Sequence, residues 1–124
     1  MKRSHSREKA FQVLYQIDIN ESQSTEELVI AMDEELDPFS RILIDGVIAH
    51  KSELDKKISD KLEKWSFNRI GTVEKTVLRI AVFEIFHQDD TPNKVVVNEA
   101  IDLSKRFNDE QSGKFINGVL SKFF

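Results

Sequence analysis

Apolar residues recur every three or four positions along most of this chain, which is the spacing of one face of an α-helix. The first stripe follows Ser6 and comprises Ala10, Phe11, Val13, Leu14 and Ile17. It ends at the polar stretch 20–24, NESQS, whose composition is typical of a connection between helices. The pattern therefore predicts an opening helix that packs one face against the rest of the protein.

Two start signals follow in the next part of the chain. Ser24 and Glu27 have the spacing of a capping box, in which each side chain satisfies a free backbone N–H at the start of a helix. Asp37 before Pro38 is typical of an N-cap with proline at the first helical position, and a long apolar stripe follows it. We therefore expect two further helical segments here, and we expect the longer one to bend or break near Lys51.

The second half of the chain contains its most apolar segment. Residues 72–86, TVEKTVLRIAVFEIF, are apolar on nearly every side, and only Arg79 and Glu84 interrupt their later part. This composition is expected of a helix that is surrounded by other helices. A turn cluster at 89–93, DDTPN, precedes another helical stripe, and residues 108–109 supply a cap for a last helix.

The last ten residues pose a choice between a β-hairpin and a helix. Asn117-Gly118 is a dipeptide typical of a tight hairpin turn. However, Phe115, Val119 and Phe123 recur every four positions, which favours a helix that contains a glycine. Because glycine costs a helix interior about 1 kcal/mol relative to alanine, we expect it to allow close approach of another backbone or of a ligand.

One pattern occurs twice: RILIDGVI at 41–48 matches KFINGVL at 114–120. Both fragments lie on predicted helices, so the repeat suggests two similar small bundles whose glycines, Gly46 and Gly118, lie where helices cross closely. The only strand-like run, residues 95–97, is too short and has no obvious partner strand. The sequence thus predicts an all-α fold with about seven helices.

Composition narrows the class of protein. The 124 residues are 40% apolar and 32% charged, as in an ordinary globular domain, and the net charge of −4 argues against a general nucleic-acid binder. The charge is uneven, however. Residues 18–37 hold eight acidic and no basic side chains, which we interpret as solvated surface, whereas residues 1–10 are basic enough to meet phosphate. The basic side chains there are Lys2, Arg3, Arg7 and Lys9.

Catalytic and metal-binding patterns are absent from the sequence. His5, His50 and His87 stand in no recognisable arrangement with acidic residues, and the chain has no cysteine, no Gly-rich phosphate loop and no zinc or calcium signature. We therefore expect no enzymatic activity, no cofactor and no metal. No apolar run approaches the length of a membrane span, and the N-terminus lacks a signal peptide, so we expect a cytoplasmic protein without membrane contact.

Six fragments follow one another in a specific order and spacing. They are REKAFQVLY, LIDGVI, W-x3-R, VEKTVLRIAVFEI, VVVNEAIDLSKRF and KFINGVL. Together they cover essentially the whole chain and resemble the NusB family of bacterial transcription antitermination factors. The resemblance implies two small helical bundles set perpendicular to each other, in a single RNA-binding domain over residues 1–124 with halves of about 1–64 and 65–124.

The resemblance also implies a role without catalysis. Family members bind the single-stranded boxA segment of nascent ribosomal or phage RNA together with ribosomal protein NusE. They join other Nus factors on RNA polymerase, so that ribosomal RNA transcripts are not terminated early. Carried over to this chain, the resemblance places these residues at the RNA: Lys2, Arg3, Arg7, Lys9, Gln111, Lys114 and Phe115. For contact with NusE it points to Glu74, and less directly to Arg69.

Several alternatives stay open at this point. Phe115 is suited either to the core or to stacking on an RNA base. Glu74 is suited either to a partner or to the positive end of its own helix. A helical scaffold that binds only protein shares every core feature and differs only at the basic N-terminus. NusB-like domains also precede an RNA methyltransferase, but we expect no such enzyme here because the sequence has neither a cofactor-binding α/β domain nor a cysteine.

Overall fold

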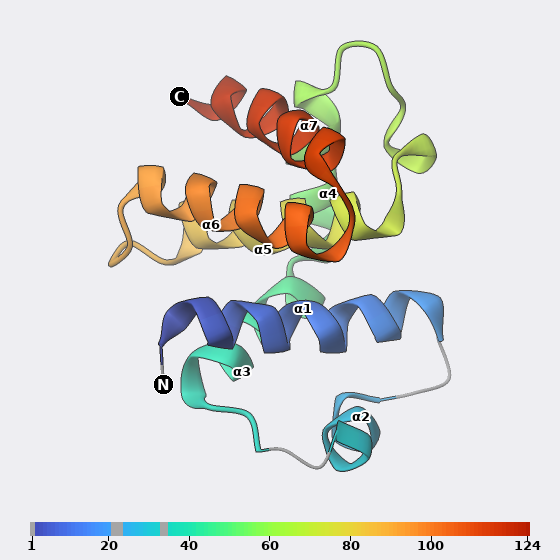
Figure 1. Cartoon of the computed structure of the whole chain (residues 1–124), viewed down its shortest axis with the longest axis vertical. Coiled ribbons are helices and arrows are strands. Elements are labelled where there is room, and N and C mark those ends of the chain that lie inside the picture. The colour runs from blue at the N-terminus through green and yellow to red at the C-terminus, as the bar shows by residue number, and fades with distance from the viewer. Residues whose placement is uncertain (1, 21–23, 33–34) are drawn as a thin grey trace.

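The computed structural model describes residues 2–20, 24–32 and 35–124. Within these ranges the protein is all-helical and has no strand, which confirms the predicted fold class (Figure 1). The described residues form seven α-helices, which are α1 (Arg3–Ile19), α2 (Thr25–Met32), α3 (Pro38–Ala49), α4 (Lys51–Lys61), α5 (Thr72–His87), α6 (Asn93–Phe107) and α7 (Glu110–Leu120). Two short 3-10 helices, η1 (Phe67–Arg69) and η2 (Ser121–Phe123), follow α4 and α7. No helix in the described ranges is long and apolar enough to cross a bilayer.

The predicted helix starts are confirmed by their hydrogen bonds. Asp37 and Asp109 each accept a hydrogen bond from the backbone N–H three residues later, at 3.3 and 2.8 Å. Ser24 Oγ accepts from the N–H of Glu27 at 3.2 Å. The long stripe after Asp37 breaks at His50, one residue before the predicted position, and this residue both ends α3 and begins α4. Local sequence signals therefore determine where these helices begin.

The central helix is α5, as its apolar sequence predicts. It packs against α1, α3, α4, α6 and α7, and its buried residues include a continuous run from Thr76 to Glu84. In Figure 1, α1 and α3 lie beside each other below α5, α6 overlaps α5 in the view, and α7 lies above them. Leu43, Leu54, Leu78 and other large apolar side chains are fully buried around it. Burial of one such side chain stabilises a fold by roughly 1.5–3 kcal/mol.

The division into halves of 1–64 and 65–124 stays a prediction. The described contacts bear on it in one way, because α4 lies in the predicted first half but packs against α5 in the second.

The last helix settles the earlier choice between a hairpin and a helix: α7 continues through Asn117 and Gly118, so the helical prediction is right.

The acidic stretch 18–37 is not solvated throughout, so that interpretation is partly wrong. Asp18 Oδ2 accepts a hydrogen bond at 2.6 Å from Arg79, a buried arginine on α5 that also pairs with Asp55 on α4. Asp37 caps α3. Residues 21, 33 and 34 of the stretch lie outside the described residues. Two of its carboxylates therefore stabilise the fold directly, because each satisfies a donor from elsewhere in the chain.

Asp37 also connects α3 to α1. Its carboxylate accepts a hydrogen bond from Ser6 Oγ at 2.6 Å, and the Ser40 hydroxyl donates to the Ser6 carbonyl at 2.9 Å. Burial raises the pKa of Asp37, but the hydrogen bonds from Ser40 and Ser6 outweigh this effect and lower the pKa to about 2 from its ordinary 3.8. The charged form of Asp37 is therefore the one that the fold stabilises.

The two glycines of the repeated pattern have different surroundings. A methyl group at Gly46 would overlap the buried ring of Phe83 on α5, so the expectation that this glycine lies where helices pack closely is confirmed. At Gly118 a methyl group would meet no atom within 4 Å. The expectation that Gly118 lies where helices cross closely is therefore wrong, because its face of α7 is open.

Substitution of the two glycines tests this contrast. Gly46→Ala should lower the free energy of unfolding by about 1–3 kcal/mol, because the new methyl group overpacks a core that has no room for it. Gly118→Ala is the matched control and should be neutral or stabilising by up to about 1 kcal/mol, as alanine is the better helix former. Urea unfolding followed by circular dichroism measures both. Equal effects would contradict the assigned packing.

The low pKa of Asp37 predicts a pH dependence of stability. A lowered pKa contributes stability that is present above the ordinary value of 3.8 and is lost as the pH falls through it towards about 2. Asp37→Ala should therefore cost about 1–2 kcal/mol at pH 7, through loss of the N-cap. The difference in free energy of unfolding between Asp37→Ala and the parent protein should shrink progressively between about pH 4 and pH 2, because these are roughly the ordinary and the lowered pKa of Asp37. Urea midpoints measured across this range check it, and a constant difference would refute it.

Candidate RNA interface

The first turn of α1 carries the two exposed basic residues of the predicted N-terminal group. Lys2 is the N-cap of α1 and is exposed. The Arg3 side chain is 43% exposed, and its guanidinium donates to Thr91 Oγ1 at 2.8 Å and to Asp90 Oδ2 at 2.7 Å. The same group lies 4.2 Å from the ring centroid of Phe39. The hydrogen bond from Arg3 lowers the pKa of Asp90, so the pair stays ionised while one edge of the arginine remains open.

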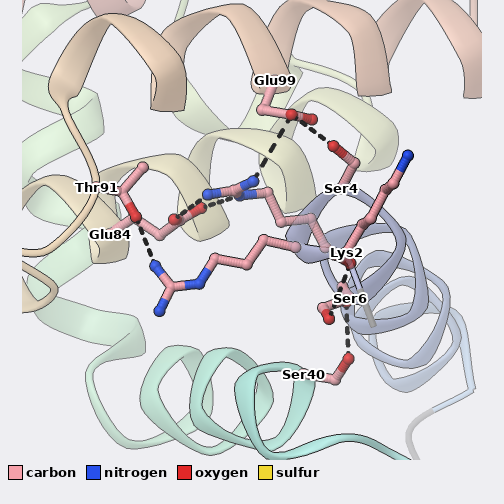
Figure 2. Close-up of polar contacts among 9 residues, drawn as sticks. Lys2, Ser4, Ser6, Ser40, Glu84, Thr91 and Glu99 are labelled. Atoms are coloured by element: carbon pink, nitrogen blue, oxygen red, sulfur yellow. Dashed lines mark hydrogen bonds and ion pairs between the residues drawn. The ribbon is translucent and has the colours of Figure 1, made fainter.

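Arg7 lies one turn further along α1 and is buried. Its Nε donates to Glu84 Oε2 at 2.7 Å, its Nη2 donates to Glu84 Oε1 at 2.8 Å, and its Nη1 lies 3.8 Å from Glu99 Oε1. Figure 2 shows Glu84, Thr91 and Glu99 gathered opposite the start of α1. Only 4% of Arg7 is exposed, so a phosphate could reach it only by displacing a buried carboxylate. Arg7 therefore attaches α1 to α5, and its contact with RNA stays a prediction.

Lys9 is buried as well, with its Nζ 3.4 Å from the carbonyl oxygen of Glu35. The predicted group of four cations is thus divided, because Lys2 and Arg3 lie on the surface while Arg7 and Lys9 lie inside. Helical spacing contained a signal for this division. Arg7 precedes Ala10 and Leu14 by three and seven positions, and these two residues belong to the apolar stripe that faces the core.

Two cations near the end of α6 were not singled out from the sequence. The Arg106 side chain is 66% exposed and lies 3.2 Å from Glu8 of α1. Lys105 is exposed beside it and lies 3.5 Å from Glu110. Both residues belong to the SKRF part of the fragment VVVNEAIDLSKRF, which was used only as a family pattern. They add positive charge between α1 and α7.

The second predicted RNA segment lies in the first two turns of α7. Gln111, Lys114 and Phe115 share one face of this helix, because they are spaced by three and four positions. Gln111 and Lys114 are exposed, whereas Phe115 is partly buried and packs against the core. Phe115 also lines a surface pocket of about 310 Å³. Both roles considered for this side chain are therefore compatible with its position.

This pocket brings together residues that the sequence analysis had assigned to different partners. Gln111 and Phe115 line it on the α7 side, and Glu74 and Arg69 line it on the side of α5 and η1. Trp65, which is 58% exposed, also lines the pocket. The sequence analysis used it only as part of W-x3-R. A large aromatic residue inside the polar connection KWSFNRIG was the available signal for a surface role.

Glu74 is buried at the floor of this region. Its Oε2 accepts hydrogen bonds from Asn108 Nδ2, at 2.7 Å, and from the hydroxyl of Ser112. These bonds fasten the start of α5 to the connection between α6 and α7. The Glu74 side chain therefore does more than complement the dipole of α5. Arg69, the other residue predicted to contact NusE, is exposed on η1.

The length of α6 separates the α1 surface from the α7 surface. Arg3 binds Asp90 and Thr91 just before α6 begins, and Gln111 follows just after α6 ends. Since α6 has 15 residues, the two surfaces lie about 20 Å apart. A single small molecule could not touch both, whereas an extended polymer could.

Comparison with known proteins decides the family, because residues 4–124 match the NusB family model. The chain belongs to the NusB family. Transcription antitermination protein NusB of Oceanobacillus iheyensis is 55% identical over 123 residues, which cover 98% of each chain. Among solved structures, T. maritima NusB is 35% identical with a TM-score of 0.89, covering 98% of this chain and 89% of that one. The family resemblance inferred from sequence fragments is confirmed.

One further solved NusB-family structure contains partners. It is a crystal structure of antitermination factors NusB and NusE in complex with double-stranded RNA. The matching chain is 31% identical to this one, with a TM-score of 0.84, and the match covers 97% of this chain and 93% of that chain. The NusB fold in that structure is thus shared almost throughout its length.

The buried Arg7 generates a prediction that separates attachment from RNA contact. Arg7→Ala should lower the free energy of unfolding by about 3–5 kcal/mol, because it leaves the Glu84 carboxylate buried without its partner. Arg3→Ala, on the same helix, removes a half-exposed pair with Asp90 and should cost less than about 1 kcal/mol. The double change Arg7→Met and Glu84→Met should recover much of the loss. Chemical denaturation of the four proteins measures this, and similar losses for Arg7→Ala and Arg3→Ala would exclude the assigned role.

Proposed function

We propose that this chain is a transcription antitermination factor that binds the boxA segment of nascent ribosomal RNA together with ribosomal protein NusE. The observation that carries the proposal is the 55% identity, over 98% of both chains, to a relative named for antitermination. The related complex with NusE and RNA, 31% identical, supports the choice of partners. In this proposal the protein acts with other Nus factors on RNA polymerase and supports the completion of ribosomal RNA transcripts.

The proposed RNA path runs from the start of α1 along α6 to α7. Single-stranded RNA is held by cations along its phosphates and by aromatic side chains against its bases. Lys2, Arg3 and Lys114 supply exposed cations, with Arg106 between them. The path is long enough for several nucleotides, because its two ends are separated by about the 20 Å length of α6.

Base recognition is proposed for the pocket beside α7. Phe115 and the exposed Trp65 offer aromatic faces there, and stacking on such faces contributes roughly 1–3 kcal/mol per base. The Gln111 amide can both donate and accept hydrogen bonds at a base edge. Arg7 and Lys9 act in this proposal through the position of α1, since neither is exposed.

The NusE surface is proposed to include Arg69 on η1, with Glu74 supporting it from beneath. A ribosomal protein is basic, and this chain carries a net charge of −4, so the overall charges favour association. Because Arg69 and Gln111 line one pocket, the two partners would approach each other at Trp65. This adjacency provides a physical route by which NusE strengthens RNA binding.

Fluorescence anisotropy of a labelled boxA RNA, with a scrambled RNA as reference, tests the proposal with and without NusE. We expect preference for boxA that increases when NusE is added. Lys114→Ala should weaken binding and reduce the slope of log K against log salt by about 0.7, the value for one lost phosphate contact with a single strand. Lys56→Ala is the matched control, because Lys56 is an exposed α4 lysine away from this path.

The opposite outcome is equally specific. Equal, weak binding of both RNAs that NusE does not change would refute the RNA-binding proposal and favour a helical scaffold that binds only protein. A normal salt slope for Lys114→Ala, with boxA preference retained, would instead remove only Lys114 from the RNA path.

A further inference from the structure

A cluster of potential metal ligands lies where the junction of α3 and α4 meets the end of α5. His50 Nδ1 is 3.3 Å from Glu53 Oε1, and His87 Nε2 is 2.9 Å from Glu53 Oε2. One ligand atom from each of the three residues can be chosen so that all lie within 4.8 Å of one another. The prediction that the histidines stand in no arrangement with acidic residues is therefore wrong for two of the three.

We propose that His50, Glu53 and His87 form a binding site for a divalent first-row transition metal, with Zn²⁺ as the preferred ion. Two imidazole nitrogens and one carboxylate oxygen are a ligand set that suits Zn²⁺. Mg²⁺ and Ca²⁺ favour oxygen ligands and fit this set poorly. Nothing in the proposed RNA-binding role uses these three side chains, so the inference stands independently of it.

The distances are close to those that coordination requires. Zn²⁺ binds nitrogen and oxygen at about 2.0–2.2 Å, which places tetrahedral ligand atoms about 3.4 Å apart. Each imidazole nitrogen lies near a different oxygen of Glu53, His50 Nδ1 at 3.3 Å from Oε1 and His87 Nε2 at 2.9 Å from Oε2. In a set of one ligand atom from each residue the separations reach at most 4.8 Å, so closure around an ion requires a shift on the order of 1 Å. All three side chains are 28–40% exposed, which leaves room for that shift and for water in the fourth position.

Packing holds the two imidazoles near each other. Their rings are stacked with centroids 4.3 Å apart, and the His87 ring stacks on Phe83 at 5.2 Å. Phe83 is buried and is fixed in turn by its close contact with Gly46. Because the lone pairs of an imidazole lie in the plane of its ring, one ring must rotate out of the stack before both nitrogens can bind the same ion. The packing therefore keeps the two ligands within reach of each other without fixing their final orientation.

The local charges are compatible with a cation. Lys51 pairs with Asp18 at 3.3 Å, and Lys57 lies over the ring of Phe86, 4.2 Å from its centroid. The Lys51 ammonium is thus neutralised by Asp18, whereas the charge of Lys57 also acts on Glu53 and would partly oppose a bound cation.

Calorimetric titration of chelator-treated, untagged protein with ZnCl₂ tests the site, since a histidine tag would bind the ion itself. We expect one saturable site per chain. His50→Ala and His87→Ala should each weaken binding at least about tenfold, because even outer contacts of metal ligands contribute 10–100-fold. His5→Ala is the matched control, because it removes an exposed histidine outside the cluster and should leave the affinity unchanged. MgCl₂ should produce no comparable binding.

Proton NMR of the histidine rings locates the ion independently. Zn²⁺ should shift the resonances of His50 and His87 but not those of His5. Glu53→Gln provides a second variant that keeps both rings, and it should also weaken binding at least about tenfold. Circular dichroism verifies that each variant is folded. Absence of saturable binding, affinity unchanged in folded His87→Ala, or shifts centred on His5 would each overturn the proposed site.

Discussion

The ion pair between Arg7 and Glu84 is the interaction on which the arrangement of this protein depends. Both charges are buried, and two hydrogen bonds fix the orientation of the guanidinium as well as its distance. Neither charge would be stable in that position without the other. The pair therefore sets the rotation of α1 about its own axis, which brings Arg3 to Asp90 and leaves Lys2 outside. In this proposal the buried Arg7, which RNA does not touch, determines where the exposed cations Lys2 and Arg3 lie.

A second buried arginine extends the same principle. Arg79 joins α5 to Asp55 of α4 and to Asp18 near the end of α1, so α1 is attached to α5 towards both of its ends. The charged residues Arg79 and Glu84 on the apolar helix α5 thus fix, through their ion pairs, how α1 and α4 lie against it. Apolar packing supplies most of the stabilisation, while these pairs determine the register in which the helices pack.

Local signals made the helices predictable, because a cap or a stripe involves residues within a few positions of one another. For this reason the sequence predicted the N-caps Asp37 and Asp109 and the break near His50. The burial of Arg7 depended on Glu84, 77 positions away, and the histidine cluster depended on His87, 34 positions from Glu53. A count of charges in a segment gives its composition but not the face on which each charge lies. Trp65 was overlooked because its connection has no periodicity that would indicate a surface.

The length of α6 has a consequence for how this family member can vary. An α-helix turns by about 100° and advances 1.5 Å with each residue. The number of residues in α6 therefore sets both the distance and the rotation of α7 relative to the start of α1. Insertion of one residue into α6 would rotate and shift α7, with Lys114 and Phe115, relative to the start of α1, even if every existing side chain were kept. Outside the proposed RNA path, which includes Arg106, changes in residue type along the outer face of α6 are therefore tolerable where changes in its length are not.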